Sequence, residues 1–105
     1  MKKLINTKLA QVLKALENTP ESKHITHTYY DGCGHFCAIG LACKTLFPDF
    51  GTGGVVDGVL IETTERTLGL SQDGLGLIIR HNDHNKYSFK KIAKLIRKNP
   101  RRYTK

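Results

Sequence analysis

Residues 35–47, HFCAIGLACKTLF, decide the fold. The stretch is apolar nearly all the way round a helix, whereas a helix at the surface keeps one polar face. Such a pattern is typical of a helix that packs against neighbours on several sides. Pro48 follows directly and ends it, because proline lacks the N–H that a further turn would need. The sequence therefore predicts a central helix over residues 35–47.

Four further helices are predicted around this one. Apolar residues recur at helical spacing over residues 5–16, and the run stops before Pro20. A short helix near residues 61–68 is followed by Gly69, a residue favoured at helix C-termini. Ser71 and Ser88 are expected to cap the N-termini of the last two helices. The fold class is therefore mainly α, with about five helices.

Strand signals are almost absent from the rest of the chain. A short extended piece is expected at residues 25–30, and a glycine-rich connector at residues 50–58. Gly51–Gly54 lacks the Lys-Ser/Thr pair that completes a phosphate-binding P-loop, so a flexible connector is the better interpretation. With 105 residues, the chain is expected to form one compact domain over residues 1–105 with a basic tail at 99–105.

The positive charge is concentrated at one end of the chain. The net charge is +8, and residues 84–105 hold nine lysines and arginines without an acid. Residues 1–83 hold eight bases and nine acids, a net charge of −1. The predicted partner is therefore a polyanion such as the nucleic acid backbone, or an acidic protein surface. The residues expected to make these contacts are Lys90, Lys91, Lys94, Arg97, Lys98, Arg101 and Arg102. Tyr103 is expected to stack on a base if the nucleic acid is single-stranded.

A metal site is the first alternative for the cysteine-rich stretch. Cys33, His35 and Cys37 lie within five positions, and glycines would let the chain bend between them. Structural zinc sites need four ligands, usually as two short pairs, and no C-x-x-C pair occurs here. We therefore expect no metal and no cofactor, with Cys37 and Cys43 as small buried hydrophobic residues.

A cysteine nucleophile is the second alternative. Cys37 or Cys33 would be the nucleophile, since both stand near the start of the central helix, where the helix dipole lowers the pKa of a thiol. His35 or the stretch His81–His84 would have to supply the base and its orienting group. The spacing matches no thiol-hydrolase motif, so no enzymatic activity is predicted and a cysteine-dependent hydrolase is the residual alternative.

Two short motifs resemble a family of small helical proteins of bacteria and their phages. Phe36-Cys37-Ala38-Ile39-Gly40 is similar to the family's C-A-I-G helix, and His81-Asn82-Asp83 to its Trp-Asn-Asp turn. The resemblance spans roughly residues 36–98 and implies architecture only, because the family has no established activity. His81 stands where the family has tryptophan, which favours a packing position over a general base. The resemblance assigns structural roles to Cys37, Gly40, Asn82 and Asp83.

From these residue types we expect particular contacts. Gly40 should let another helix approach closely, since it carries no side chain. Asp83 should cap backbone N–H groups of the following turn or of the helix that Cys37 begins.

The predicted function is non-catalytic binding of a polyanion through the basic C-terminal helix and tail. Two alternatives remain: a small phage-encoded inhibitor that docks on an acidic host protein, and a binder of a small phosphorylated nucleotide. Three cysteines are an odd number, which disfavours a disulfide framework, and no apolar run is long enough for a membrane span. We therefore expect a cytoplasmic protein with reduced thiols and no membrane partner.

Overall fold

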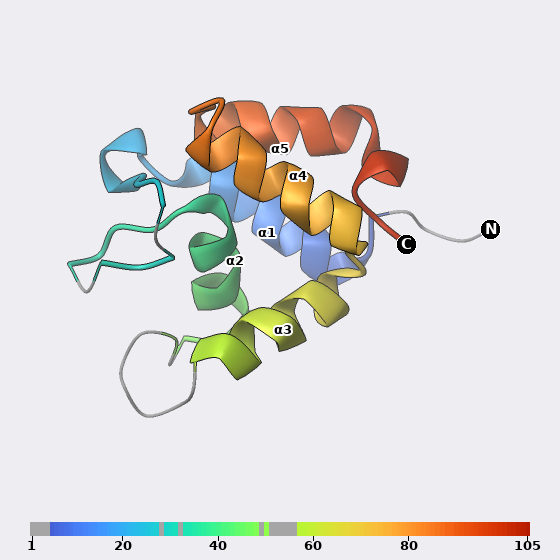
Figure 1. Cartoon of the computed structure of the whole chain (residues 1–105), viewed down its shortest axis with the longest axis horizontal. Helices are drawn as coiled ribbons and strands as arrows, with labels where there is room; N and C mark the ends of the chain where they lie inside the picture. Colours follow the sequence, from blue (N-terminus) through green and yellow to red (C-terminus); the bar gives the residue numbers. More distant parts are fainter. Residues whose placement is uncertain (1–4, 28, 32, 49, 51–56) are drawn as a thin grey trace.

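The computed structural model describes residues 5–27, 29–31, 33–48, 50 and 57–105. The elements in chain order are α1 (Thr7–Asn18), η1 (Glu21–Lys23), α2 (Ala38–Leu46), α3 (Asp57–Leu68), α4 (Gln72–Asp83), α5 (Phe89–Lys98) and η2 (Pro100–Arg102). The α elements are α-helices and the η elements are short 3₁₀ helices, and they gather into one body (Figure 1). The radius of gyration of 12.6 Å matches the value of about 13 Å expected for a compact domain of this size. The prediction of a mainly α single domain is confirmed.

Helix α2 lies at the centre of the fold, as predicted. Its first six residues, Ala38–Cys43, are all buried, and α2 contacts α1, α3 and α4. The helix begins three residues later than the sequence pattern indicated. Phe36 pairs with the backbone of His24 and Tyr30 in isolated β-bridges, so the chain is still extended there. Cys37 is the N-cap, with φ −80° and ψ 176°.

Helix α5 packs its apolar side against α1. Phe89, Ile92, Ala93 and Ile96 are at most 1% exposed, whereas the lysines between them are exposed. This separation follows from the 3.6-residue period, which places positions three and four apart on one face. The apolar stripe of α5 therefore fixes the direction in which its basic residues point.

Hydrogen bonds confirm the two predicted caps, Ser71 and Ser88, and the predicted terminator, Gly69. Ser71 Oγ accepts from the backbone N–H of Gly74 at 2.9 Å, and Ser88 Oγ accepts from that of Lys91 at 3.1 Å. Gly69 has φ +71° and ends α3, since its N–H and that of the next residue donate to carbonyls of the last helical turn. Helix α3 starts at residue 57, four residues before the predicted start. The predicted connector at Gly51–Gly54 lies outside the described residues.

The first turns of α2 and α4 each pack closely against the backbone carbonyl of a tyrosine. A methyl group built on Gly40 in the first turn of α2 would overlap the carbonyl oxygen of Tyr29 and lie 2.7 Å from its carbonyl carbon. A methyl group on Gly74 in the first turn of α4 would overlap the carbonyl oxygen of Tyr103 in the same way. The prediction that a helix packs against Gly40 is wrong, because the segment that approaches it is the backbone of Tyr29, in the loop before α2.

The chain after α5 folds back onto the start of α4. Thr104 forms an isolated antiparallel bridge with Leu70, and the N–H of Lys105 donates to the carbonyl of Gly69 at 2.9 Å. Tyr103 is 1% exposed and belongs to the core. The prediction that Tyr103 stacks on a base is therefore wrong. Among the described residues, no helix has both the length and the apolar character to span a membrane.

Candidate functional site

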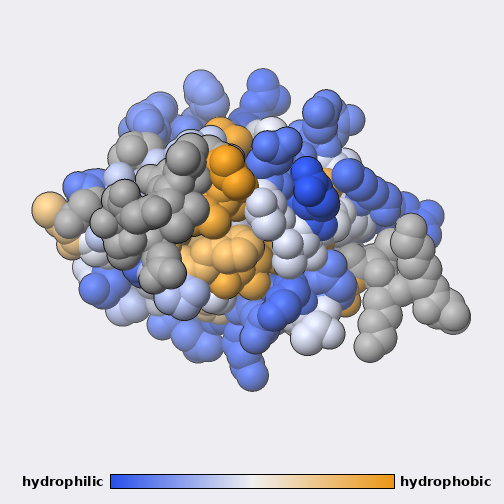
Figure 2. All heavy atoms as spheres, turned by 90° about the horizontal axis from the view of Figure 1, so that it is seen from below, coloured by the Kyte–Doolittle hydropathy of each residue, from blue (hydrophilic) through white to orange (hydrophobic). Residues whose placement is uncertain are grey.

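The basic residues predicted from the sequence lie on the outer side of α5 and on η2. Lys90, Lys91, Lys94, Lys98, Arg101 and Arg102 are all exposed, and we call these six residues the basic face. Lys90, Lys94 and Lys98 are four residues apart, so they follow one another along the helix at about 6 Å intervals of rise. On the side of the molecule away from α5, Figure 2 shows apolar side chains gathered in a patch among hydrophilic ones.

Arg97 does not belong to the basic face. Its guanidinium forms two hydrogen bonds with the Glu17 carboxylate of α1, at 2.8 and 2.9 Å. These bonds lower the pKa of Glu17 and raise that of Arg97. Arg97 therefore joins α5 to α1, and we leave it out of the basic face because its guanidinium is already paired; that it contacts a phosphate stays a prediction. Lys91 is exposed, but its Nζ lies 4.0 Å from the centre of the Tyr87 ring, a cation–π contact.

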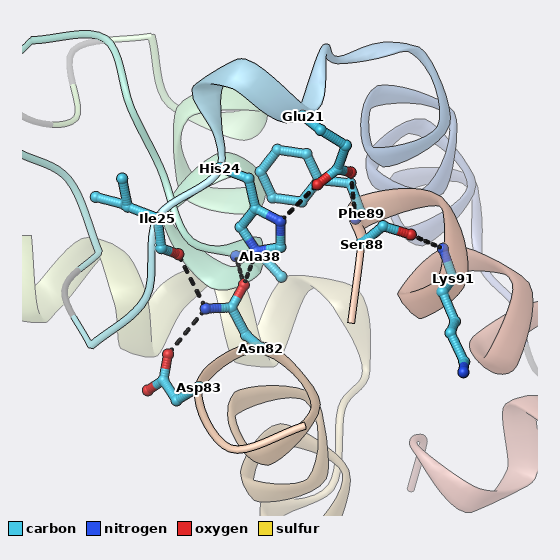
Figure 3. Close-up of polar contacts among 9 residues, drawn as sticks. All are labelled: Glu21, His24, Ile25, Ala38, Asn82, Asp83, Ser88, Phe89 and Lys91. Atoms are coloured by element: carbon cyan, nitrogen blue, oxygen red, sulfur yellow. Dashed lines mark hydrogen bonds and ion pairs between the residues drawn. The ribbon is translucent and has the colours of Figure 1, made fainter. Parts of the chain in front are cut away.

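A second polar region joins the ends of three helices around Asn82. This side chain, 2% exposed, projects from the last turn of α4. Its Nδ2 donates to the carbonyl of Ile25 at 3.1 Å and to Asp83 Oδ1 at 2.8 Å. Its Oδ1 accepts from the N–H of Ala38, the first residue of α2, at 3.0 Å and lies 2.6 Å from His24 Nε2 (Figure 3). Asn82 thus satisfies two backbone groups in segments distant in sequence.

His24 and Glu21 extend this network to α5. The amide oxygen of Asn82 can only accept a hydrogen bond, so His24 Nε2 must be the donor in this contact. The other ring nitrogen of His24 lies 2.8 Å from Glu21 Oε2. Glu21 Oε1 accepts from the N–H of Phe89, the first residue of α5, at 2.6 Å. The His24 ring stacks on that of Phe89 with centroids 4.0 Å apart, so the network is held against the core (Figure 3).

Asp83 has different partners from those predicted. Its Oδ1 accepts from the backbone N–H of His27 at 2.8 Å, in the loop before α2, and from Asn82. The residue that caps α2 is Asn82, so the prediction that Asp83 caps this helix is wrong. Partial burial opposes ionisation of Asp83. The two hydrogen bonds and the charges of the His27 and His84 rings outweigh that effect and lower the pKa of the carboxyl.

The lowered pKa of Asp83 predicts a change in acid stability. A carboxyl with a lower pKa in the folded state stabilises the fold above its unfolded pKa of about 4, and this contribution is lost as the pH falls through the folded value. Asp83→Asn should therefore lower the melting temperature at pH 7, and the difference from the wild type should shrink towards about pH 3. Thermal unfolding at several pH values measures this difference. A constant difference between the two proteins at all pH values would contradict the assignment.

The cysteines are separated by their environments. Cys33 is exposed, whereas Cys37 and Cys43 are buried as predicted. Burial raises the pKa of the Cys37 thiol, although the backbone N–H groups at the start of α2, including that of Gly40 at 3.3 Å from Sγ, act in the opposite direction. The protonated thiol is thereby favoured, which weakens the case for Cys37 as a nucleophile.

Cys33, His35 and Cys37 are not assembled into a metal site. His35 Nδ1 lies 2.7 Å from Asp31 Oδ2, while the Asp31 Oδ1 accepts from the N–H of Cys33 at 2.7 Å. In the part of the chain that the structure describes, no group of three or more histidine, cysteine or acidic side chains is arranged to hold a metal ion. The Asp31 carboxylate therefore orders this turn through contacts within the turn itself.

His81 occupies a packed position, as the sequence indicated. It is 8% exposed and its Nε2 lies 3.0 Å from the hydroxyl oxygen of Tyr103. Its Nδ1 lies 3.3 Å from Asn85 Oδ1. His81 thus joins the end of α4 to the C-terminal segment.

A pocket of about 240 Å³ opens beside the Asn82 network, at the start of α2. It is lined by His27, Tyr29, Cys37, Ile39, Ile79, Asn82 and Asp83. The sequence singled out three of these residues, Cys37, Asn82 and Asp83, as structural elements, and Cys37 also as a candidate metal ligand or nucleophile. The signal that was missed is the helical periodicity of α4, which determines the residues of this helix that share one face. If the helix continues through Asp83, then Ile79 and Asp83 are one turn apart on one side, next to the face of Asn82.

Comparison of the chain with family models, with curated proteins and with solved structures gave no match. The resemblance of residues 36–98 to the helical family of bacteria and phages stays a prediction. The function is therefore argued from the basic face and the pocket.

Proposed function

We propose that this protein binds the phosphate backbone of nucleic acid, without choosing a sequence, through the basic face of α5 and η2. The observation that supports this most is the exposed row of Lys90, Lys94 and Lys98. Among the described residues, none of these three lysines pairs with a carboxylate. Arg101 and Arg102 extend the row beyond the end of the helix.

The packing of α5 supports the proposal, because it fixes the backbone of the helix before a ligand binds. Four buried apolar residues and the Arg97–Glu17 pair hold the helix against the core and α1. The lysines are therefore presented on a fixed support, and only their side chains lose freedom on binding. Contacts of this kind go to phosphates, which position a protein on nucleic acid but carry no sequence information. Because Tyr103 is buried, its ring is not offered for base stacking.

The number of free cations sets the expected salt dependence. If Lys90, Lys94, Lys98, Arg101 and Arg102 each neutralise one phosphate, log Kd should change with log salt by a slope of about 4.5. Affinity for a DNA duplex should then fall about 500-fold between about 50 and 200 mM salt. Fluorescence anisotropy with a labelled duplex of mixed sequence measures this slope.

A pair of triple variants tests the surface. Lys90→Gln, Lys94→Gln and Lys98→Gln together should weaken binding at low salt and reduce the slope by about 3. Lys8→Gln, Lys23→Gln and Arg66→Gln remove the same charge from exposed positions on α1, η1 and α3. This control should retain nearly the full slope. Equal loss in both triple variants would show a general charge effect and contradict the assignment to α5. No binding by the wild type at low salt would reject the proposed function.

A further inference from the structure

The pocket at the start of α2 combines an apolar wall with a carboxylate. Ile39 and Ile79 contribute aliphatic surface from α2 and α4, and Tyr29 contributes an aromatic residue. Asp83 contributes the carboxylate, at the end of α4. Ligand pockets typically have this composition, a mainly apolar lining with a few polar groups that fix orientation. The volume of about 240 Å³ suits a small molecule.

The Asp83 carboxylate is held in place through Oδ1, while Oδ2 accepts no hydrogen bond from the residues that the structure describes. Oδ1 accepts from the N–H of His27 and from the amide of the buried Asn82, which fixes the orientation of the group. Among the described residues, the basic side chain within 4 Å of Oδ2 is that of His27, whose Nδ1 lies at 3.9 Å, too far for a hydrogen bond. In Figure 3 this second oxygen makes no contact with the residues drawn. The His27 side chain is 66% exposed, so an incoming group can displace it.

The same pocket is unsuited to an anion. Among the described residues that line it there is no lysine or arginine, and the lowered pKa of Asp83 keeps a negative charge there at neutral pH. Free N–H groups at a helix N-terminus would favour an anion, but two of those at the start of α2 are occupied. The N–H of Ala38 donates to Asn82 Oδ1, and that of Gly40 donates to Cys37 Sγ. The alternative of a phosphorylated nucleotide is therefore not supported at this pocket.

We propose that this pocket binds a small organic amine as its ammonium ion, with Asp83 as the counter-ion. The ammonium would donate to Asp83 Oδ2, and its short apolar or aromatic body would lie against Ile39 and Ile79. Tyr29 would add an aromatic face to which a cation is attracted. This site is separate from the basic face and does not depend on nucleic acid binding.

Three probes of similar shape and different charge test the proposal on the folded protein. Benzylammonium, benzyl alcohol and benzoate are titrated at equal ionic strength, and binding is followed by amide chemical shifts. Benzylammonium should bind with a Kd on the order of 1 mM, and the other two probes about tenfold more weakly or less. The shifts should map to the residues around Ile39, Ile79 and Asp83.

A matched pair of carboxamide variants tests the counter-ion. Asp83→Asn keeps the shape and the acceptor for His27, and it should weaken benzylammonium binding about tenfold, to the level of benzyl alcohol. Asp73→Asn removes an exposed carboxylate from the same helix, outside the pocket, and should leave binding unchanged. Equal binding of benzylammonium and benzyl alcohol, tighter binding of benzoate, or an unaffected Asp83→Asn variant would overturn the proposal. So would no binding of any probe at about 20 mM.

Discussion

Replacing Gly40 with alanine is expected to lower the stability of the fold by about 3 kcal/mol or more. The added methyl group would overlap the carbonyl of Tyr29, and a backbone group cannot rotate away as a flexible side chain can. Alanine is the better helix former by about 1 kcal/mol, which offsets only part of this cost. A loss of this size corresponds to a fall in melting temperature of about 15 °C, measured by circular dichroism. Gly74→Ala should behave alike, since its methyl group would overlap the carbonyl of Tyr103.

Gly76 supplies the control within the same helix as Gly74. A methyl group there would meet nothing within 4 Å, and the residue is exposed. Gly76→Ala should therefore raise stability by up to about 1 kcal/mol through helix propensity alone. If Gly40→Ala and Gly74→Ala were as stable as Gly76→Ala, the close approach of the two tyrosine carbonyls would be wrong.

Asn82→Ala is expected to lower the free energy of unfolding by about 3 to 4 kcal/mol. The substitution removes the partners of the Ala38 N–H and the Ile25 carbonyl and one partner of His24. Each buried polar group left without a partner costs about 1 to 3 kcal/mol. Urea unfolding measures the total loss.

Hydrogen exchange separates the capping role of Asn82 from simple loss of packing. The amide of Ala38 should exchange faster in Asn82→Ala, even at a temperature where the variant is fully folded. Asn18→Ala, an exposed asparagine at the end of α1, is the control and should change stability by less than about 0.5 kcal/mol. An Ala38 amide that is as protected as in the wild type would show that Asn82 does not cap α2.

Features set by local sequence could be predicted. The caps Ser71 and Ser88 and the terminator Gly69 act on residues at most four positions away, so their patterns are visible in short stretches. The start of α2 could not be placed in this way. Phe36 looks helical by its apolar character, but its pairing with His24 and Tyr30 holds it extended, and periodicity does not report such contacts.

In the candidate sites, too, features set by local sequence could be predicted and features set by contacts distant in sequence could not. The exposed lysines of α5 follow from the apolar period of the helix, which the sequence displays. Arg97 was assigned to the same surface because its partner, Glu17, lies 80 positions away. At the end of α4, the sequence marked Asn82 and Asp83 as a pair but assigned the cap to the wrong member. The helix continues through both residues, which puts Asn82 on the buried face of Ile78 and leaves Asp83 at the pocket.

The paired starts of α2 and α4 offer a way to identify diverged relatives. In each, a capping side chain is followed after two positions by a glycine, as Cys37 by Gly40 and Ser71 by Gly74. Each glycine packs against the backbone carbonyl of a tyrosine. A residue that replaced the tyrosine would still have this carbonyl, whereas any residue that replaced the glycine would add a side chain that overlaps it. Relatives that keep this fold are therefore expected to keep both glycines, even where the surface residues that determine their ligands have changed completely.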